Sequence, residues 1–240
     1  MNHEVLVLLP GHLCDEWVWT SVIHSLKPDG GKPLIIPLGA KPSIAALADE
    51  VEAKLPPGKI ALAGFSLGGM VALELMKRSP ERIGRLALIG TTARKAEAPE
   101  CTAMTAGQER FKSGAVEGLI LDFVTFLSAP SVVEQNATLV TETVNMMLRN
   151  ASCFESQQQA IMHRPDHLAL LGKINCPVTV IYGALDMIAP AEIHHEMAKL
   201  IPNCDLVEVP MAGHMILTEK PELVVAALKS WLAQHPIPLP

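Results

Sequence analysis

The chain is poor in several features that would direct it to a large or charged partner. Only 4% of its 240 residues are aromatic, and its 19 lysines and arginines are outnumbered by 25 aspartates and glutamates. A formal net charge of −6 argues against nucleic acid or an anionic membrane surface as a partner. No apolar run approaches the roughly 18 residues that a membrane-spanning helix needs. This composition agrees with an ordinary soluble enzyme.

Cysteine is also scarce, and its pattern excludes a disulfide framework. The five cysteines are odd in number, widely separated and free of any Cys-x-x-Cys motif. Reduced thiols in a cytoplasm fit this usage. The first residues carry no basic stretch of the kind that opens a signal peptide, so we expect a cytoplasmic protein.

The most informative segment is the Gly-x-Ser-x-Gly motif Gly64-Phe65-Ser66-Leu67-Gly68. It separates an apolar run that can form a buried strand from an apolar run that can form a helix. A serine at such a junction sits on a sharp, strained turn, and small residues on both sides let the strand and the helix approach each other. The alternative is an ordinary strand-to-helix turn. The apolar flanks favour Ser66 as a nucleophile.

A serine nucleophile needs a base, and four histidines lie far enough downstream to be considered. His214 follows the predicted strand 205–209 on a short loop, from which it can reach across a cleft. His194 and His195 lie in a helical pattern that we expect to be a solvated face, and His235 lies in a proline-rich tail. We therefore predict His214 as the base, against the alternative of a structural loop histidine.

The base needs an orienting acid, and Asp186 occupies the expected place. It follows the apolar strand 177–182 and precedes a helix that begins near Pro190. The preceding strand, 85–90, ends without an acidic residue, and Asp205 opens its own strand at the wrong end. The alternative for Asp186 is a helix N-cap, a place that aspartate also favours.

Alternating strands and helices predict an α/β protein with a mostly parallel sheet of about six strands, flanked by helices. Its active site should lie at the carboxyl ends of the strands. The predicted strands are 4–9, 33–37, 59–63, 85–90, 177–182 and 205–209, and the predicted helices are 16–26, 43–55, 67–78, 190–200 and 221–234.

The strand pattern stops between residues 93 and 165, which predicts a helical cap inserted into a core domain made of residues 1–92 and 166–240. Eight apolar residues of this insertion could line a pocket, although apolar helical stripes usually pack among themselves, and we expect each to be packing rather than to touch substrate. They are Phe111, Leu119, Phe123, Phe126, Leu127, Met146, Met147 and Met162. His163 and His167 are too weak a pattern for a metal site, and we expect no cofactor or metal.

These motifs resemble the α/β-hydrolase superfamily over nearly the whole chain, through the elbow at Ser66, the Gly-x-x-Asp loop at Asp186 and the Gly-His pair at His214. Small carboxylesterases and enol-lactonase-like members are the most similar, because their oxyanion loop reads Pro-Gly-x-x-Cys-Asp, as residues 10–15 do here. The commoner superfamily sequence has His-Gly where this chain has Pro-Gly, a change that keeps the backbone donors. The resemblance implies an oxyanion hole formed by the backbone N–H groups of His12 and Leu67.

The resulting hypothesis is a serine hydrolase that cleaves a small, mainly uncharged carboxylic ester or lactone through an acyl-enzyme. The cations of the insertion are scattered, which gives no reason to expect an anionic substrate: Arg94, Lys95, Arg110, Lys112, Arg149 and Arg164. The same superfamily also contains C–C bond hydrolases, acyltransferases and perhydrolases, and a ligand receptor could retain the triad. The sequence leaves these alternatives open, and with them the choice between monomer and dimer.

Overall fold

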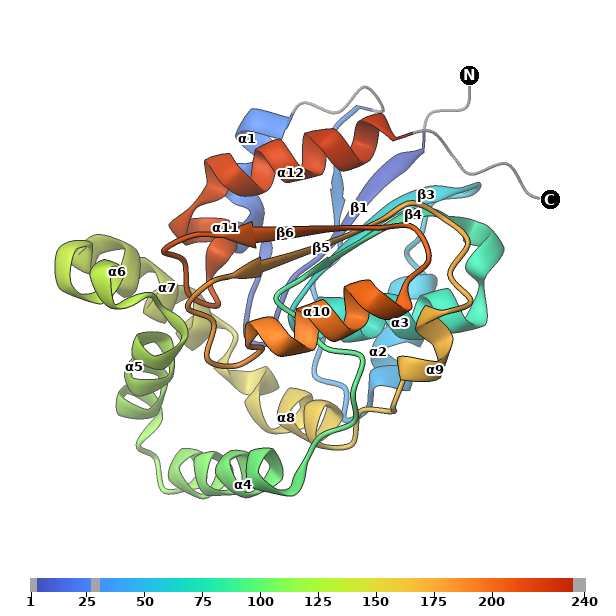
Figure 1. The fold of residues 1–240 in the computed structure, drawn as a ribbon. Helices are drawn as coiled ribbons and strands as arrows, with labels where there is room; N and C mark the ends of the chain where they lie inside the picture. Colours follow the sequence, from blue (N-terminus) through green and yellow to red (C-terminus); the bar gives the residue numbers. More distant parts are fainter. Residues whose placement is uncertain (1–3, 27–30, 235–240) are drawn as a thin grey trace.

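A parallel sheet forms the centre of the protein in a computed structural model that describes residues 4–26 and 31–234 (Figure 1). Within these residues the sheet has six strands in the order β2-β1-β3-β4-β5-β6, and every neighbouring pair is parallel. The strands are β1 (Val5–Leu9), β2 (Leu34–Ile35), β3 (Ile60–Phe65), β4 (Ile83–Ile89), β5 (Val178–Gly183) and β6 (Cys204–Val209). The predicted α/β fold is confirmed.

The central strands are buried on both faces, and alternate side chains enter two separate cores. On β3, Ala61, Ala63 and Phe65 belong to one core, and Ile60 and Leu62 belong to the other. This division follows from the two-residue period of a strand. Continuous apolar runs therefore become strands only where helices cover both faces of the sheet.

Two groups of helices provide this cover (Figure 1). The helices on the first face are α1 (Thr20–Leu26), α11 (Ile216–Glu219) and α12 (Pro221–Ala233). The helices on the second face are α2 (Ile44–Glu52), α3 (Leu67–Arg78) and α10 (Ala191–Leu200), with η2 (Pro80–Arg82) and α9 (Leu168–Leu171) in the connections.

Two predicted elements differ in extent from what the sequence suggests. The strand expected at 33–37 is reduced to β2, because Pro33 and Pro37 have no N–H group to donate to a neighbouring strand. The helix expected at 16–26 begins as the 3₁₀ turn η1 (Glu16–Trp19), where the Asp15 carboxylate accepts a hydrogen bond from the Trp17 amide at 2.9 Å. His235 lies outside the described residues.

Between β4 and β5 the chain forms a run of helices without a strand, here called the helical segment (residues 98–162). It lies on the side of the molecule toward which the strands β5 and β6 point (Figure 1). Its elements are α4 (Ala98–Lys112), α5 (Val116–Leu127), α6 (Pro130–Gln135), α7 (Ala137–Arg149), η3 (Ala151–Cys153) and α8 (Phe154–Met162). In the part of the chain that the structure describes, no helix is both long and apolar enough to cross a membrane.

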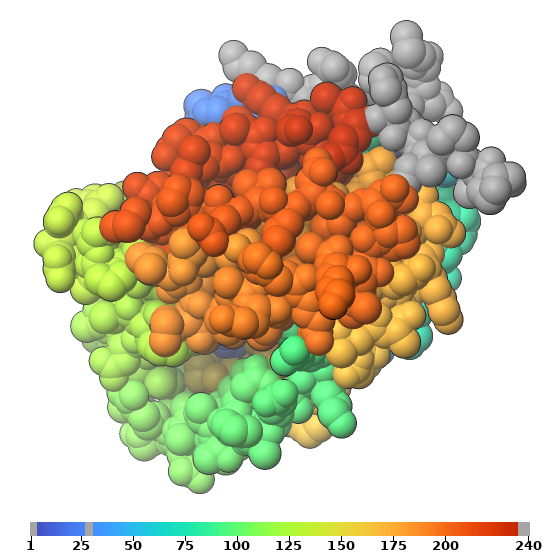
Figure 2. Space-filling view, in the orientation of Figure 1, coloured from blue at the N-terminus to red at the C-terminus, as the bar shows by residue number. Residues whose placement is uncertain are grey.

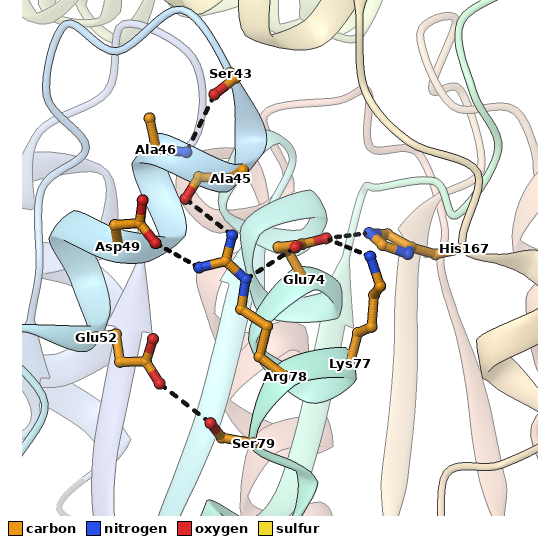
Figure 3. A network of polar contacts seen from close by, with 10 residues as sticks. All are labelled: Ser43, Ala45, Ala46, Asp49, Glu52, Glu74, Lys77, Arg78, Ser79 and His167. Carbon is orange, nitrogen blue, oxygen red and sulfur yellow. Dashed lines mark hydrogen bonds and ion pairs between the residues drawn. The ribbon is translucent and has the colours of Figure 1, made fainter.

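A polar network at the C-terminal end of α3 connects this helix to its neighbours (Figure 3). Glu74, buried on α3, lies 2.9 Å from Arg78 Nε and 3.1 Å from the imidazole of His167, and Arg78 reaches Asp49 on α2 at 2.6 Å. The backbone N–H of His167 also donates to the carbonyl of Ala93 at 2.7 Å. Because Ala93 precedes the helical segment and His167 follows it, the two connections to the core are joined beside α3.

We predict that Gly68→Ala destabilises the protein by about 1–3 kcal/mol, because its methyl group would lie 2.5 Å from the carbonyl oxygen of Leu9 and 2.7 Å from that of Pro10. Backbone atoms at these distances have to move. The matched control is Gly118→Ala on α5, where the added methyl group meets no atom within 4 Å. This control should be neutral or stabilising by up to about 1 kcal/mol. Urea unfolding measures both, and equal midpoints for the two variants would contradict the prediction.

Candidate active site

Ser66 lies between β3 and α3 in a backbone conformation that is rare for any residue except glycine. Its φ is 53° and its ψ is −116°. Two hydrogen bonds fix the turn to the end of β4 and the loop that follows it. The Ser66 amide donates to the Ile89 carbonyl at 2.9 Å, and the Thr91 hydroxyl donates to the Ser66 carbonyl at 2.8 Å. Strain of this kind costs on the order of 1–3 kcal/mol and persists only where surrounding contacts impose it. Here it holds the hydroxyl at the carboxyl edge of the sheet.

The structure brings Ser66, His214 and Asp186 together from three different strand ends. His214 Nε2 lies 3.0 Å from Ser66 Oγ, and His214 Nδ1 lies 2.7 Å from Asp186 Oδ2. Both partners of the serine are buried, with exposed fractions of 3% for His214 and 4% for Asp186. The His214 amide donates to Leu127 of the helical segment at 2.7 Å, so the histidine loop is held from above as well as from β6.

The environment of Asp186 fixes both its charge and the tautomer of the histidine. Burial works to raise the pKa of Asp186, but the neighbouring His214 and hydrogen bonds from the amides of Ile188 and Ala189 outweigh it, and the pKa lies below its usual value. The charged carboxylate can only accept, so His214 carries its proton on Nδ1. The lone pair of Nε2 therefore faces the hydroxyl of Ser66.

The two segments that carry the predicted oxyanion amides meet at this serine, since a Cβ atom on Gly11 would lie 3.2 Å from Ser66 Cβ. Leu67 is the first residue of α3, where N–H groups have no partner within the helix, and His12 lies in the loop after β1. Among the hydrogen bonds of the described residues, neither amide donates to a loop or side-chain acceptor of the protein. The His12 ring lines the adjacent cavity, and burial lowers its pKa to about 4. It is neutral at physiological pH.

A cavity of about 360 Å³ opens over Ser66 and His214, between the sheet edge and the helical segment. In the space-filling view the surface is hollowed where the green helices meet the orange segment that follows β5 (Figure 2). The lining of the cavity is mainly apolar. The polar side chains of the lining, besides Ser66, His12 and His214, are Thr91, Thr92, Glu100, Gln158 and Arg164.

Five of the eight apolar candidates line the cavity, and four of these five also pack in or against the core; Phe126 is the exception. The five are Leu119, Phe123, Phe126, Leu127 and Met147, whereas Phe111, Met146 and Met162 do not line the cavity. The reason is geometrical: the helical segment folds over the carboxyl edge of the sheet, so its apolar faces cover the site as well as one another. The helical period alone cannot distinguish these two surroundings.

The prediction that His194 and His195 lie on a solvated face is wrong for His194. His194 is fully buried and stacks on Tyr182 with ring centroids 4.8 Å apart, and burial lowers its pKa to about 4. His195 is exposed, with Nε2 3.0 Å from the Tyr182 hydroxyl. His163 contacts the Gln159 carbonyl, away from the Glu74 contact of His167. Among the described residues, no group of three or more His, Cys, Asp or Glu side chains could hold a metal ion.

Sequence reasoning missed Glu219 on α11, which braces the histidine loop. Its carboxylate accepts a hydrogen bond from the Gly213 amide at 2.8 Å and from the Ala129 amide at 3.3 Å. Burial raises the pKa of Glu219 above its usual value, against these amide bonds. A single glutamate five residues after a histidine carries no signal that could have identified it. The pairing of Glu100 with Arg164 in the cavity was missed for the same reason, because 64 residues separate them.

Proteins of known fold and name are similar to this chain. The chain is 29% identical to a pimeloyl-[acyl-carrier protein] methyl ester esterase of Nitrosomonas europaea, with 94% of each chain covered. It is 27% identical to a bifunctional biotin-biosynthesis protein of Teredinibacter turnerae, of which it spans 45%. A thermophilic esterase from Thermogutta terrifontis superposes with a TM-score of 0.82 at 26% identity, covering 96% of this chain and 89% of the esterase.

An enol-lactonase from Burkholderia xenovorans has the same fold, with a TM-score of 0.83 at 19% identity over 98% of this chain and 93% of the lactonase. The family model described as the alpha/beta hydrolase fold matches residues 37–221, a span that includes Ser66, Asp186 and His214. The chain belongs to the α/β-hydrolase fold family.

Proposed function

We propose that this protein is a serine hydrolase of small carboxylic esters or lactones, with Ser66, His214 and Asp186 as its catalytic residues. The observation that carries the proposal is the continuous chain of contacts from Asp186 through His214 to Ser66, at 2.7 Å and 3.0 Å, at the bottom of an apolar cavity. The carboxylic ester hydrolase expected from the sequence agrees with the esterases among the relatives.

In the first half of the reaction, Ser66 Oγ attacks the ester carbonyl carbon while His214 Nε2 takes the hydroxyl proton. The carbonyl oxygen becomes negative and is stabilised by the amides of His12 and Leu67, an interaction that is often worth about 3 kcal/mol per donor. His214 then gives its proton to the departing alkoxide, and the acyl group stays on Ser66. Asp186 holds the imidazole and stabilises its cation throughout.

In the second half, His214 takes a proton from water, and the hydroxide attacks the acyl carbon. The bond to Ser66 Oγ breaks, the serine recovers its proton from His214, and the carboxylic acid leaves. This sequence needs no group beyond the side chains and amides named here. We also propose that residues 93–165 act as a cap, because the helical segment supplies ten apolar side chains to the cavity lining.

We place the enzyme in the cytoplasm. All five cysteines are free thiols, as in a reducing compartment. Cys14 beside the oxyanion loop is buried, and burial raises the pKa of its thiol to about 12, so it is not a second nucleophile.

The charge of the cavity supports an uncharged substrate. Arg164 lies in the cavity wall with its side chain only 4% exposed, and it is neutralised by Glu100 at 2.9 Å. Four of the other five cations of residues 93–165 are also in ion pairs, namely Arg94 with Glu196, Arg110 with Asp122, Lys112 with Glu155 and Arg149 with Asp15. A carboxylate in this cavity would therefore be buried without a free cation, which is costly.

The first prediction concerns the nucleophile. A fluorophosphonate probe should label Ser66, and Ser66→Ala should abolish labelling and lower kcat by about 10⁴-fold or more. The control is Ser113→Ala, which changes an exposed serine and should retain both. Labelling that survives in Ser66→Ala would identify a different nucleophile. A wild-type protein that is labelled once but never turns over an ester would instead be a receptor.

The second prediction concerns the acid. In Asp186→Asn, the side-chain oxygen can still accept from Ile188 and Ala189, which turns the NH₂ group toward His214. His214 must then carry its proton on Nε2, facing Ser66, and kcat should fall by about 10⁴-fold. Asp205→Asn is the control and should keep wild-type activity.

The pH dependence distinguishes the members of the triad. Because the pKa of Asp186 is lowered, this carboxylate stays charged throughout the range in which histidines titrate. In a profile of kcat/KM against pH, the contribution of Asp186 should therefore be kept throughout this range and lost only at lower pH. If Asp186→Asn removed a protonation step from the profile within the range in which histidines titrate, this assignment would be wrong.

The third prediction concerns charge selectivity. For esters of equal length, kcat/KM should be at least about tenfold higher for a neutral acyl chain than for one that ends in a carboxylate, because the carboxylate finds no free partner. Glu100→Gln frees Arg164 in the cavity and should move the preference toward the carboxylate. Asp122→Asn is the matched control, since it frees Arg110 outside the cavity lining. An equal shift in both variants would mean that the ion pair in the cavity does not set selectivity.

A further inference from the structure

The loop that carries His12 has a conformation that it cannot hold alone. Leu13 has a φ of 55°, in the left-handed region where a side chain is strained. Within the turn, the Cys14 amide donates to the Gly11 carbonyl at 3.1 Å, and the Cys14 thiol donates to the His12 carbonyl at 3.4 Å. A non-glycine residue in this region costs on the order of 1–3 kcal/mol unless its surroundings impose the conformation. The proposed oxyanion amide of His12 belongs to the Gly11–His12 peptide unit, whose carbonyl accepts the bond from the Cys14 amide, so its direction depends on what keeps Leu13 in the turn.

The holding group comes from the helical segment. Gln157 on α8 is 1% exposed, and its Oε1 accepts the Leu13 amide at 2.9 Å. The same oxygen lies 3.1 Å from His12 Nδ1. Its Nε2 donates to the carbonyls of Leu38 and Gly39, at 2.9 Å and 3.3 Å. One buried amide therefore connects the loop after β1, the loop after β2 and α8.

The partners of Gln157 leave a single orientation for its amide. A flipped amide would point its NH₂ group at the Leu13 N–H and its oxygen at two carbonyls, which removes three hydrogen bonds. With Oε1 fixed, His12 must carry its proton on Nδ1. Burial lowers the pKa of His12 to about 4, so the ring stays neutral and keeps this tautomer at physiological pH. The ring of His12 and the amide that follows it are thus held by the same oxygen.

We propose that Gln157 is a positioning residue for the oxyanion hole: the helical segment sets the direction of the His12 amide through Gln157. The proposal rests on the proposed function, because it takes the His12 amide as an oxyanion donor. Gln157 does not line the cavity and therefore acts through the loop, not on the substrate. Its effect should appear when negative charge develops on the carbonyl oxygen, and not when the substrate binds.

The test compares Gln157→Met with Gln159→Met. Methionine has a similar length but offers no comparable donor or acceptor. Gln159 is on the same helix, and among the described residues its side chain bonds only to Gln108, at 3.3 Å, away from the oxyanion loop. We expect Gln157→Met to lower kcat by about 10- to 100-fold, less than the 10²–10³ for complete loss of a donor, with KM changed by less than about threefold. Gln159→Met should match the wild type in both constants.

A second readout separates positioning from a general loss of structure. Binding of a trifluoromethyl ketone, which forms an anionic adduct with Ser66, should weaken by the same factor as kcat falls. Unchanged ketone affinity alongside a fallen kcat would overturn the proposal, as would a folded Gln157→Met with wild-type kcat. If Gln157→Met does not fold, Gln157→Glu keeps an acceptor for Leu13 and His12, and its kcat should stay within about tenfold of the wild type. A larger loss in folded Gln157→Glu would overturn the proposal.

Measuring the rate at which the fluorophosphonate probe phosphonylates Ser66 tests the positioning role without knowledge of the natural substrate. In this reaction the Oγ–P bond forms, fluoride leaves, the serine proton passes to His214, and charge grows on an oxygen in the same hole. A wild-type protein that hydrolyses no ester would refute the proposed function only. The positioning role would still be judged by whether Gln157→Met slows phosphonylation relative to Gln159→Met, and equal rates would refute it.

Discussion

The strained turn at Ser66 is the constraint on which the rest of the site depends. It can exist only where α3 approaches β3 and the loops after β1 and β4 within van der Waals distance, which is why Gly64, Gly68 and Gly69 surround it. The two cores of the sheet supply the apolar burial that offsets the strain. In return, the hydroxyl is held at one height above the sheet edge. The loops that follow β1, β5 and β6 can then meet it at fixed distances.

The predicted site residues that the structure brings together are those with a local signature. Ser66 lies in a motif with glycines on both sides, and Asp186 and His214 each follow an apolar strand. The alternation of strands and helices then places all three at one edge of a parallel sheet. What the sequence cannot give is contact between distant surfaces. Three features depend on such contacts between distant segments: the burial of His194, the pairing of Glu100 with Arg164, and the exposure of five of the eight apolar candidates to the cavity. No periodicity within a helix encodes those contacts.

Most cations of the helical segment are paired with carboxylates, so they offer no free positive charge to an anionic ligand. Exposed ion pairs such as Arg110 with Asp122 add little to stability, because solvent and salt screen them. Arg164 differs, since its buried guanidinium is held by Glu100 and by the carbonyls of Ile161 and Arg94. Removing Glu100 from this site would leave an uncompensated buried charge, whereas Arg164 with all its partners leaves the cavity wall without net charge.

The helical segment contacts both sides of the proposed catalytic site: Gln157 on α8 accepts a hydrogen bond from the loop of His12, and the Leu127 carbonyl accepts one from the loop of His214. A lid hinged as one rigid body would therefore dismantle the site each time it lifted. Product release must instead proceed through motions that leave α8 and the end of α5 in place. An enzyme built in this way would be inactive whenever the helical segment moves away from the sheet edge. Esters that are too large to be enclosed would meet a serine without an organised hole, and size discrimination would then arise from assembly of the catalyst rather than from steric exclusion alone.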